Sequence, residues 1–232
     1  MGTLTKHAPS LGRKSKVMVA LLPKGVRARP ADASFLSTGD VIAGQTSISL
    51  NHATGTVVAA GQYLRFVTPT GEERLVKVST TTPANATAIP VVALTEDLPA
   101  GSTADFPVEF FDRSAADIDF SYNLAEVSTL NTGGNRDGVI TGGSADINLP
   151  GIFYHYCAGA NTVFEAANNG AEVWLEIEYE APGEGYAHGR RIGGPAGVTG
   201  RTQASPNDGF VSADIKAAFL GGVDERMPVK AQ

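Results

Sequence analysis

The chain has 232 residues, of which 42% are hydrophobic and 18% are charged, and its formal net charge is −6. This length allows one large domain, or a domain of about 130 residues with a second small one. No apolar run approaches the roughly 20 residues of a membrane-spanning helix, so we expect no membrane insertion. The N-terminus lacks the apolar segment of a signal peptide. Cys157 is the only cysteine, which excludes an intrachain disulfide and favours synthesis in a reducing cytosol.

Positive charge is concentrated at the start of the chain. Up to Pro30 no residue is acidic and seven are basic, namely Lys6, Arg13, Lys14, Lys16, Lys24, Arg27 and Arg29. The rest of the chain holds all 24 acidic residues and 11 of the 18 basic ones. A basic segment can bind nucleic acid, and it can equally dock on an acidic neighbour of the same kind. The charge distribution is therefore suited to self-association.

The first part of the chain, 1–39, combines a predicted arm with a predicted strand. Residues 1–16 are polar and basic and predict a flexible arm, whereas the apolar run 17–22 predicts a short strand. From 40 to 107 the sequence consists of short β-like runs separated by clusters of turn residues. The runs are 46–50, 62–68, 74–79 and 88–94. The sequence therefore predicts a small additional β-module at 40–107.

Turn signals within this module are specific. The sequence PTGEE at 69–73 joins two of the runs as a predicted hairpin. Three similar tripeptides predict turn glycines, and their spacing is too irregular for a repeat protein: Ala43-Gly44-Gln45, Ala60-Gly61-Gln62 and Ala100-Gly101-Ser102.

The remainder, 108–232, predicts the main β core. Strands are expected at 118–129, 145–156, 171–180 and 210–220. Between two of them, Thr162 as N-cap and Glu165 form a capping box, and Asn168-Asn169-Gly170 ends a helix predicted over 163–169. Residues 181–209 are rich in glycine and proline and have no apolar period. We expect there a long loop that has a function or becomes ordered on a partner.

The stretch AEVWLEIEYE at 171–180 alternates strictly. Val173, Leu175, Ile177 and Tyr179 share one side of the predicted strand, and the other side carries Glu172, Trp174, Glu176, Glu178 and Glu180. Glutamates in line on one face repel one another, so we expect that face to look at water. One interpretation is an ordinary solvated strand, and the other is a smooth anionic surface. We expect Trp174 to be covered, by a neighbouring subunit or by a loop of the same chain.

No residue pattern indicates catalysis or a cofactor. His155-Tyr156-Cys157 is the one close pairing of soft metal ligands, and nothing completes a zinc site. Asp112, Asp117 and Asp119 lack the spacing of a calcium loop. Neither a phosphate-binding loop with its lysine nor a serine nucleophile elbow occurs. We therefore expect no cofactor, no metal and no enzymatic activity.

The segment NLAEVSTLNTGGNRDG at 123–138, followed by VITGG and ADINLPG up to residue 151, resembles tail tube proteins of long-tailed bacteriophages. In that family a strand ending in V-(S/T)-T-L precedes a Gly-rich, Arg-bearing turn and a second strand. The subsequent order of short helix, alternating strand, long loop and final strand also matches. The resemblance covers roughly 118–222.

The resemblance implies a mainly β fold, a β-sandwich or half-barrel with one short α-helix. It implies hexameric rings whose inner sheets join into one barrel, which stack into a tube through an N-terminal arm and a long loop. The lumen of such a tube is typically acidic, and DNA passes through it without specific binding. The candidate lumen lining is then Glu172, Glu176, Glu178 and Glu180, and the candidate inter-ring arm is Lys6, Arg13, Lys14 and Lys16.

The implied partners are further copies of the chain and other tail components: a terminator, a baseplate or tip, and possibly a sheath. The implied location is the virion tail, after synthesis in the cytoplasm of the host bacterium. Two alternatives stay open. One is the tube of a contractile injection or type VI secretion system. The other is a carbohydrate- or receptor-binding β-module of a virion, which an exposed aromatic patch on 40–107 would favour.

Overall fold

The computed structural model describes residues 16–110, 117–127, 137–152, 157–181, 185–204 and 212–230. In these ranges the chain is mainly β with one helix, which confirms the predicted fold class. The elements are β1 (Lys16–Leu21), β2 (Ala33–Leu36), β3 (Ser47–Ser49), β4 (Tyr63–Val67), β5 (Glu73–Lys77), β6 (Ala88–Pro90), β7 (Thr103–Phe106), β8 (Val108–Glu109), β9 (Asp117–Val127), β10 (Asp137–Ile152), α1 (Ala158–Asn169), β11 (Glu172–Glu178), β12 (Tyr186–His188), β13 (Arg191–Ala204), β14 (Ser212–Phe219), β15 (Asp224–Arg226) and β16 (Val229–Lys230).

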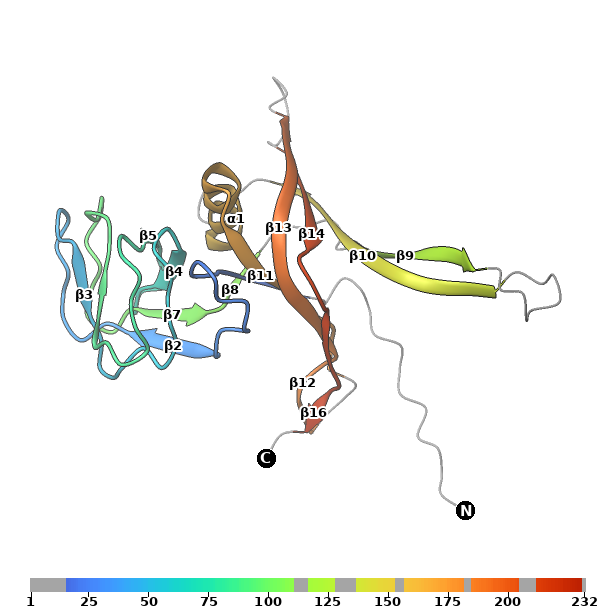
Figure 1. The fold of residues 1–232 in the computed structure, drawn as a ribbon. Coiled ribbons are helices and arrows are strands. Elements are labelled where there is room, and N and C mark those ends of the chain that lie inside the picture. Colours follow the sequence, from blue (N-terminus) through green and yellow to red (C-terminus); the bar gives the residue numbers. More distant parts are fainter. Residues whose placement is uncertain are drawn as a thin grey trace, which may run out of the picture.

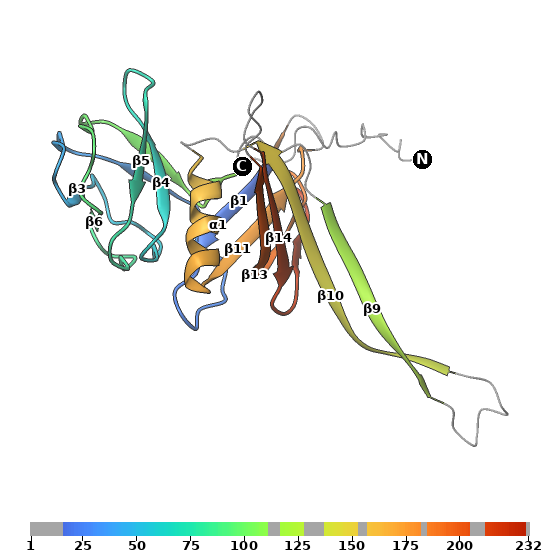
Figure 2. The same cartoon turned by 90° about the horizontal axis from the view of Figure 1, so that it is seen from above.

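Eight strands form the main sheet, in the order β8-β1-β11-β13-β14-β10-β9, with β15 paired to β13. All of its neighbouring strands are antiparallel. The helix α1 lies against β1, β11 and β13, and the β9–β10 hairpin projects away from the rest of the molecule (Figures 1 and 2). Strands β9, β11 and β14 match predicted positions, whereas β10 begins earlier than expected, at Asp137.

Alternation along the strands gives the main sheet an apolar face and a polar face. Buried side chains from four strands pack with Val163 and Ala166 of α1 on the apolar face: Val17 and Val19, Val173, Leu175 and Ile177, Ile215 and Ala217, and Ile147 and Leu149. Directly paired residues of neighbouring strands share a face. The opposite, polar face therefore carries the alternate residues of the same strands.

The predicted start of the helix is wrong. It begins at Ala158 with Cys157 as the N-cap, whose sulfur accepts a hydrogen bond from Ala160 N at 3.4 Å. Thr162 lies inside the helix and is fully buried. The predicted end is confirmed, because Gly170 adopts φ 60° and its N–H bonds to Ala166 O. A helix start with no Ser, Thr, Asp or Asn at its cap gives a weaker sequence signal.

The loop predicted at 181–209 is wrong in its larger part, because β12 and the central strand of the main sheet, β13, lie within it. Glycines explain the missed signal. A Cβ atom on Gly193 would lie 2.8 Å from Leu175 O and 2.9 Å from Glu176 Cβ. Pro195, which lies opposite Trp174, further disguises the strand, since proline is rare in central strands.

The strands from β2 to β7 form two smaller sheets, β2-β7-β4-β5 and β3-β6. The predicted hairpin is confirmed: β4 and β5 pair around a turn that contains Gly71. The three predicted turn glycines, Gly44, Gly61 and Gly101, all have φ between 80° and 90°. Side chains rarely adopt this backbone conformation, which accounts for glycine at each turn.

These small sheets have a pseudo-two-fold arrangement. One constant shift along the sequence carries the bridge Ser37↔Leu50 onto Val78↔Val91, and the same shift carries β3 onto β6. Likewise β2 corresponds to β5 and β4 to β7, so the strand order reads the same when the halves are exchanged. Four turns with i to i+3 hydrogen bonds recur in pairs, ending at Gln45, Gln62, Ala86 and Ser102. The irregular glycine spacing thus belongs to a two-fold repeat and not to a linear array.

One of these four turns docks on the main sheet and α1. Gln62 is fully buried; its Oε1 accepts from Leu21 N at 2.7 Å, and its Nε2 donates to Thr162 Oγ1 at 3.0 Å. Thr162 Oγ1 also accepts from Tyr63 N at 3.1 Å. Nearby, Lys77 Nζ pairs with Glu165 Oε1 at 2.7 Å. Buried polar groups with complete partners fix one relative placement of the elements that carry them.

Candidate functional site

The two sides predicted for the acidic strand are found in β11. Val173, Leu175 and Ile177 are buried against α1 and the rest of the apolar core. Glu172, Trp174, Glu176 and Glu178 alternate with them and lie on the polar face, whereas Tyr179 and Glu180 follow the end of the strand.

The expectation that this polar face is solvated is wrong for its centre. Glu176 is 2% exposed and Trp174 is 4% exposed within a single chain. The repulsion that we expected between glutamates is offset by arginines from the segment between β1 and β2. While Arg29 covers it, Glu176 presents no solvated charge, which argues against this residue as part of a lumen lining.

Arg29 and Glu176 form a bidentate ion pair. Arg29 Nε donates to Glu176 Oε2 at 2.7 Å, and Nη2 donates to Oε1 at 2.9 Å. The two side chains are 9% and 3% exposed. The indole Nε1 of Trp174 donates to the same carboxylate at 3.3 Å. The hydrogen bond to Glu176 raises the pKa of Arg29, although burial opposes the charge.

Arg27 and Glu172 form a second pair at the other end of β11. Arg27 Nε and Nη2 donate to the two oxygens of Glu172 at 2.9 and 2.6 Å, and Nη1 donates to Leu220 O at 3.2 Å. The hydrogen bond raises the pKa of Arg27 and lowers that of Glu172. Arg27 is 55% exposed, so water screens this pair much more than the pair at Arg29.

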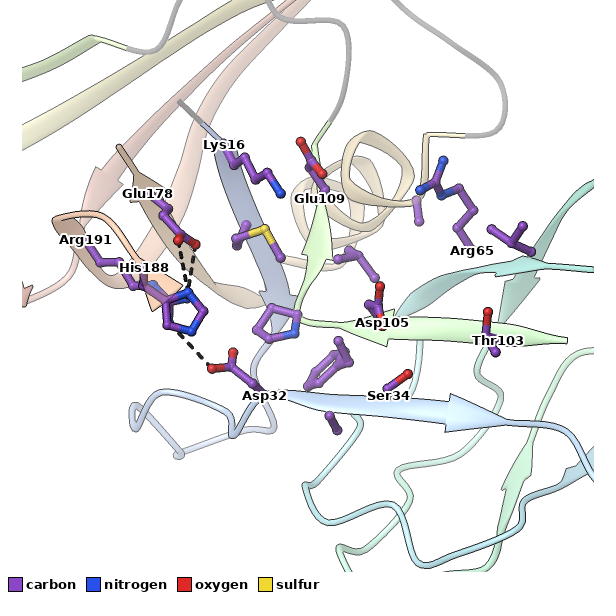
Figure 3. Close-up of a pocket in the computed structure, with 17 residues that line it drawn as sticks. Lys16, Asp32, Ser34, Arg65, Thr103, Asp105, Glu109, Glu178, His188 and Arg191 are labelled. Carbon is purple, nitrogen blue, oxygen red and sulfur yellow. Dashed lines mark hydrogen bonds and ion pairs between the residues drawn. The ribbon is translucent and has the colours of Figure 1, made fainter. Parts of the chain in front are cut away.

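A third basic residue, Arg191 at the start of β13, joins the remaining acidic groups. Its Nη2 lies 3.1 Å from Glu178 Oε2 and its Nη1 lies 3.5 Å from Asp32 Oδ2. His188 Nδ1 lies 3.1 Å from Glu178 Oε1 and contacts Arg191 (Figure 3). Burial raises the pKa of Asp32, but the hydrogen bonds and charges of Arg29 and Arg191 outweigh it and the net shift is downward.

This cluster lies at one end of a cleft between the main sheet and the β2-β7-β4-β5 sheet. The cleft has a volume of about 610 Å³. Its charged lining is mixed, with Lys16, Arg65 and Arg191 opposed by Asp32, Asp105, Glu109 and Glu178 (Figure 3). Among the described residues, no three His, Cys, Asp or Glu side chains are grouped to hold a metal ion. Within the same ranges, no helix is long and apolar enough to cross a membrane.

The polar face has a different character on the β9, β10 and β14 side. Asp119 of β9 lies directly opposite Asp146 of β10, and Asp214 and Lys216 lie on the neighbouring strand β14. All four residues are exposed, whereas Ile147, Ile215 and their buried neighbours face the other way. Three carboxylates and one amine thus form an open, net-acidic area that the sequence did not single out.

The candidate arm residues are only partly described. Lys6, Arg13 and Lys14 lie outside the described residues. Lys16 is the first residue of β1 and pairs in register with Glu178, so it belongs to the sheet and not to an arm.

The pairing of Arg27 and Arg29 with β11 was missed by the sequence reasoning. The charge asymmetry of the sequence pointed to this contact, because a basic segment is expected to dock on an acidic one. In the structure the acidic strand is β11 of the same chain. Sequence separation hid this contact, because the paired residues are 145 and 147 positions apart.

No protein-family model matches the chain, and no curated protein matches it. Several chains of solved structures are similar to it, among them the following two. A chain in the tail of an empty gene transfer agent particle, refined with C6 symmetry, has 22% identity and a TM-score of 0.40, over 50% of this chain and 84% of that one. A chain in the virion of a native gene transfer agent particle has 20% identity and a TM-score of 0.41, over 50% of this chain and 86% of that one.

Proposed function

We propose that the protein is a structural component of a phage-like virion tail that assembles into stacked hexameric rings and forms the tail tube. The main support is the two-faced main sheet. Its apolar face is used by α1 and the core, and its polar face is open and acidic on the β9, β10 and β14 side. The resemblance of 118–222 to tail tube proteins supports the same function.

In this proposal the open part of the polar face lines the bore. Asp119, Asp146 and Asp214 are exposed and outnumber Lys216, so the wall repels DNA and offers no site at which the genome stalls. Of the candidate lining on β11, Glu172 and Glu178 are paired with arginines and contribute less net charge. Glu180 remains a candidate at the end of that strand.

The edges of the main sheet support ring closure. β9, an 11-residue strand, ends the sheet on one side, and the two-residue β8 ends it on the other. A long sheet edge is a template for pairing with another chain. Closing several copies into one barrel pairs such edges and removes them from solvent.

Negative-stain microscopy of the purified protein tests the assembly. We expect rings or tubes with six-fold symmetry about a central hole. A protein that stays monomeric at high concentration, even with seed tubes or other tail components, would contradict the proposal.

A second experiment tests which face lines the bore. The double variant Asp119→Lys and Asp146→Lys should fold and assemble, because both side chains are exposed, but its particles should deliver genome poorly. The matched control is Glu96→Lys, at an exposed position in the small sheets. Normal delivery by the double variant would refute the assignment of the bore while leaving the tube itself in place.

The alternative of a carbohydrate- or receptor-binding module receives no support from residues 40–107. The aromatic side chains of this segment are Tyr63, which is partly buried, and Phe66 and Phe106, which are buried. Its exposed large hydrophobic side chains are aliphatic: Ile42, Val57 and Val92. Binding of a sugar ring by stacking needs an exposed aromatic surface.

A further inference from the structure

The segment 22–32 connects β1 to β2 and lies across the polar face of β11. In the part of the chain that the structure describes, one backbone hydrogen bond links it to the main sheet, from Leu22 N to Glu172 O at 2.9 Å. A second, from Val26 N to Pro23 O, closes a turn within the segment. Val26, its largest aliphatic side chain after Leu22, is 45% exposed. Neither backbone pairing nor apolar burial therefore accounts for its position beyond Leu22.

Side-chain charges hold the segment instead. Arg29 is the deepest contact, with two hydrogen bonds to Glu176, one to Asp32 at 2.8 Å and one to Pro30 O at 3.1 Å. Arg191 belongs to β13, and its Nε lies 3.7 Å from Glu176. This Nε is buried and has no hydrogen-bond partner among the described residues. The contact at Arg27 is exposed and adds little.

We propose that segment 22–32 is a strap latched by the Arg29–Glu176 pair. It opens as a unit while the main sheet and the small sheets stay folded. Its opening uncovers Trp174 and Glu176. The flanking strands do not depend on the strap: β1 is paired with β11 and β8, and β2 is paired with β7. Segments with few apolar contacts and few backbone bonds are the ones that open below the free energy of global unfolding.

The state of the latch also determines how many contacts hold the small sheets against the main sheet. The strap is one of the two chain connections between them, and the other runs through Pro107 into β8. With the strap open, β8 and the contacts of Gln62, Tyr63 and Lys77 with β1 and α1 would still hold the small sheets in place. This inference does not depend on the tube function.

Trp174 reports the state of the strap directly, because it is the only tryptophan of the chain. A groove gives a small quencher a route to the indole. It is lined by Trp174 itself, Pro195, Arg27, Arg29 and the turn at Leu220. Acrylamide is the suitable quencher, since it carries no charge and is not itself attracted or repelled by the latch.

The experiment compares acrylamide quenching of full-length Arg29→Met with the original protein. We expect a several-fold larger quenching constant and a red-shifted emission, with unchanged far-UV circular dichroism and a cooperative thermal transition. The matched control is Arg27→Met, which removes the exposed arginine of the same strap and should leave quenching almost unchanged. Arg29→Lys keeps the charge but loses the bidentate geometry, so its quenching should be intermediate.

Two results would overturn the latch. Quenching of Arg29→Met equal to that of the original protein would mean that the strap stays closed without the ion pair. Exposure of Trp174 only together with loss of the circular dichroism signal would mean that the strap does not open separately. If Arg29→Met does not fold, Arg29→Lys decides in the same way: a larger quenching constant with intact structure supports the latch, and an unchanged constant refutes it.

Discussion

Arg29 and Glu176 lie 147 positions apart in the sequence, and their side chains meet in a bidentate ion pair that is almost closed to water. A buried pair gains little over an apolar pair of the same shape, because both charges lose their hydration. Removing one partner is costly, however, since the other charge then remains buried without its counterion. The pair therefore specifies where the strap lies more than it adds to stability.

The first prediction follows from this asymmetry. Glu176→Gln should lower the free energy of unfolding by about 3 kcal/mol, because Arg29 and Arg191 lose their shared carboxylate. Urea denaturation measures the change. The control, Glu72→Gln, removes an exposed partner of Arg74 and should cost about 0.5 kcal/mol or less. Equal effects of the two variants would show that the Glu176 pair is not worth more than a surface pair.

Alternation predicted much of this fold from the sequence. The buried side of β11, the strand β1, the hairpin at Gly71 and the end of α1 at Gly170 were all predicted, because each depends on neighbours in the chain. Local periodicity and turn chemistry carry such information without any knowledge of tertiary contacts.

The remaining features depend on contacts between distant residues. Alternation placed Glu176 on a polar face, but only the strap shows that this face is covered at that point. β13 was not predicted as a strand, because its glycines allow close approach between strands and leave no apolar period. Thr162 looked like a helix cap, whereas its hydroxyl accepts hydrogen bonds from Gln62 and Tyr63. The two-fold repeat in the small sheets was not recognised in the sequence, because its fourth turn, at Pro83–Ala86, lacks the glycine of the other three.

The second prediction concerns the close approach of β13 to β11. Gly193→Ala should lower the free energy of unfolding by about 1–3 kcal/mol, because the new methyl group would meet Leu175 O and Glu176 Cβ at under 3 Å. Gly200→Ala in the same strand is the control: its nearest neighbour, Lys216 Cβ, is at 3.9 Å, which is an ordinary contact. Thermal and urea unfolding of the two variants measure the difference. Similar stability of both would argue against close packing at Gly193.

The third prediction concerns the contact between the small sheets and the helix. Gln62→Ala leaves the buried Leu21 N–H without its acceptor and removes one of the two donors to Thr162 Oγ1, so it should cost about 2–3 kcal/mol of unfolding free energy. The matched control is Gln45→Ala, in the related but exposed turn, where the side chain accepts one hydrogen bond from Ile42 N. It should cost less than about 1 kcal/mol. If Gln45→Ala proved as harmful as Gln62→Ala, turn geometry and not docking would be the cause.

The fourth prediction is a loss of stability in acid. The pKa values of Asp32 and Glu172 are lowered in the folded protein by their arginine partners. Their contribution is therefore present above the unfolded pKa values, about 4, and is lost as the pH falls through the lower folded values. Urea unfolding between pH 6 and pH 3 (a range of about three units around these values) measures the loss. Arg27→Ala should make the loss smaller, because the pKa of Glu172 then returns toward its ordinary range; an unchanged acid loss in this variant would exclude the pair as a source.

The fifth prediction concerns the basic N-terminal residues. Deleting residues 1–15 should leave the circular dichroism of the fold unchanged, because β1 begins only at Lys16. The deletion stops before Lys16, since that residue pairs with Glu178 in the main sheet. If the basic segment joins rings, the shortened protein should form shorter or less stable tubes under electron microscopy. Tubes of the full-length protein should also loosen at raised salt, because screening weakens attraction between exposed charges. Tubes of normal length that resist salt equally with and without residues 1–15 would remove the basic segment from the contact between rings.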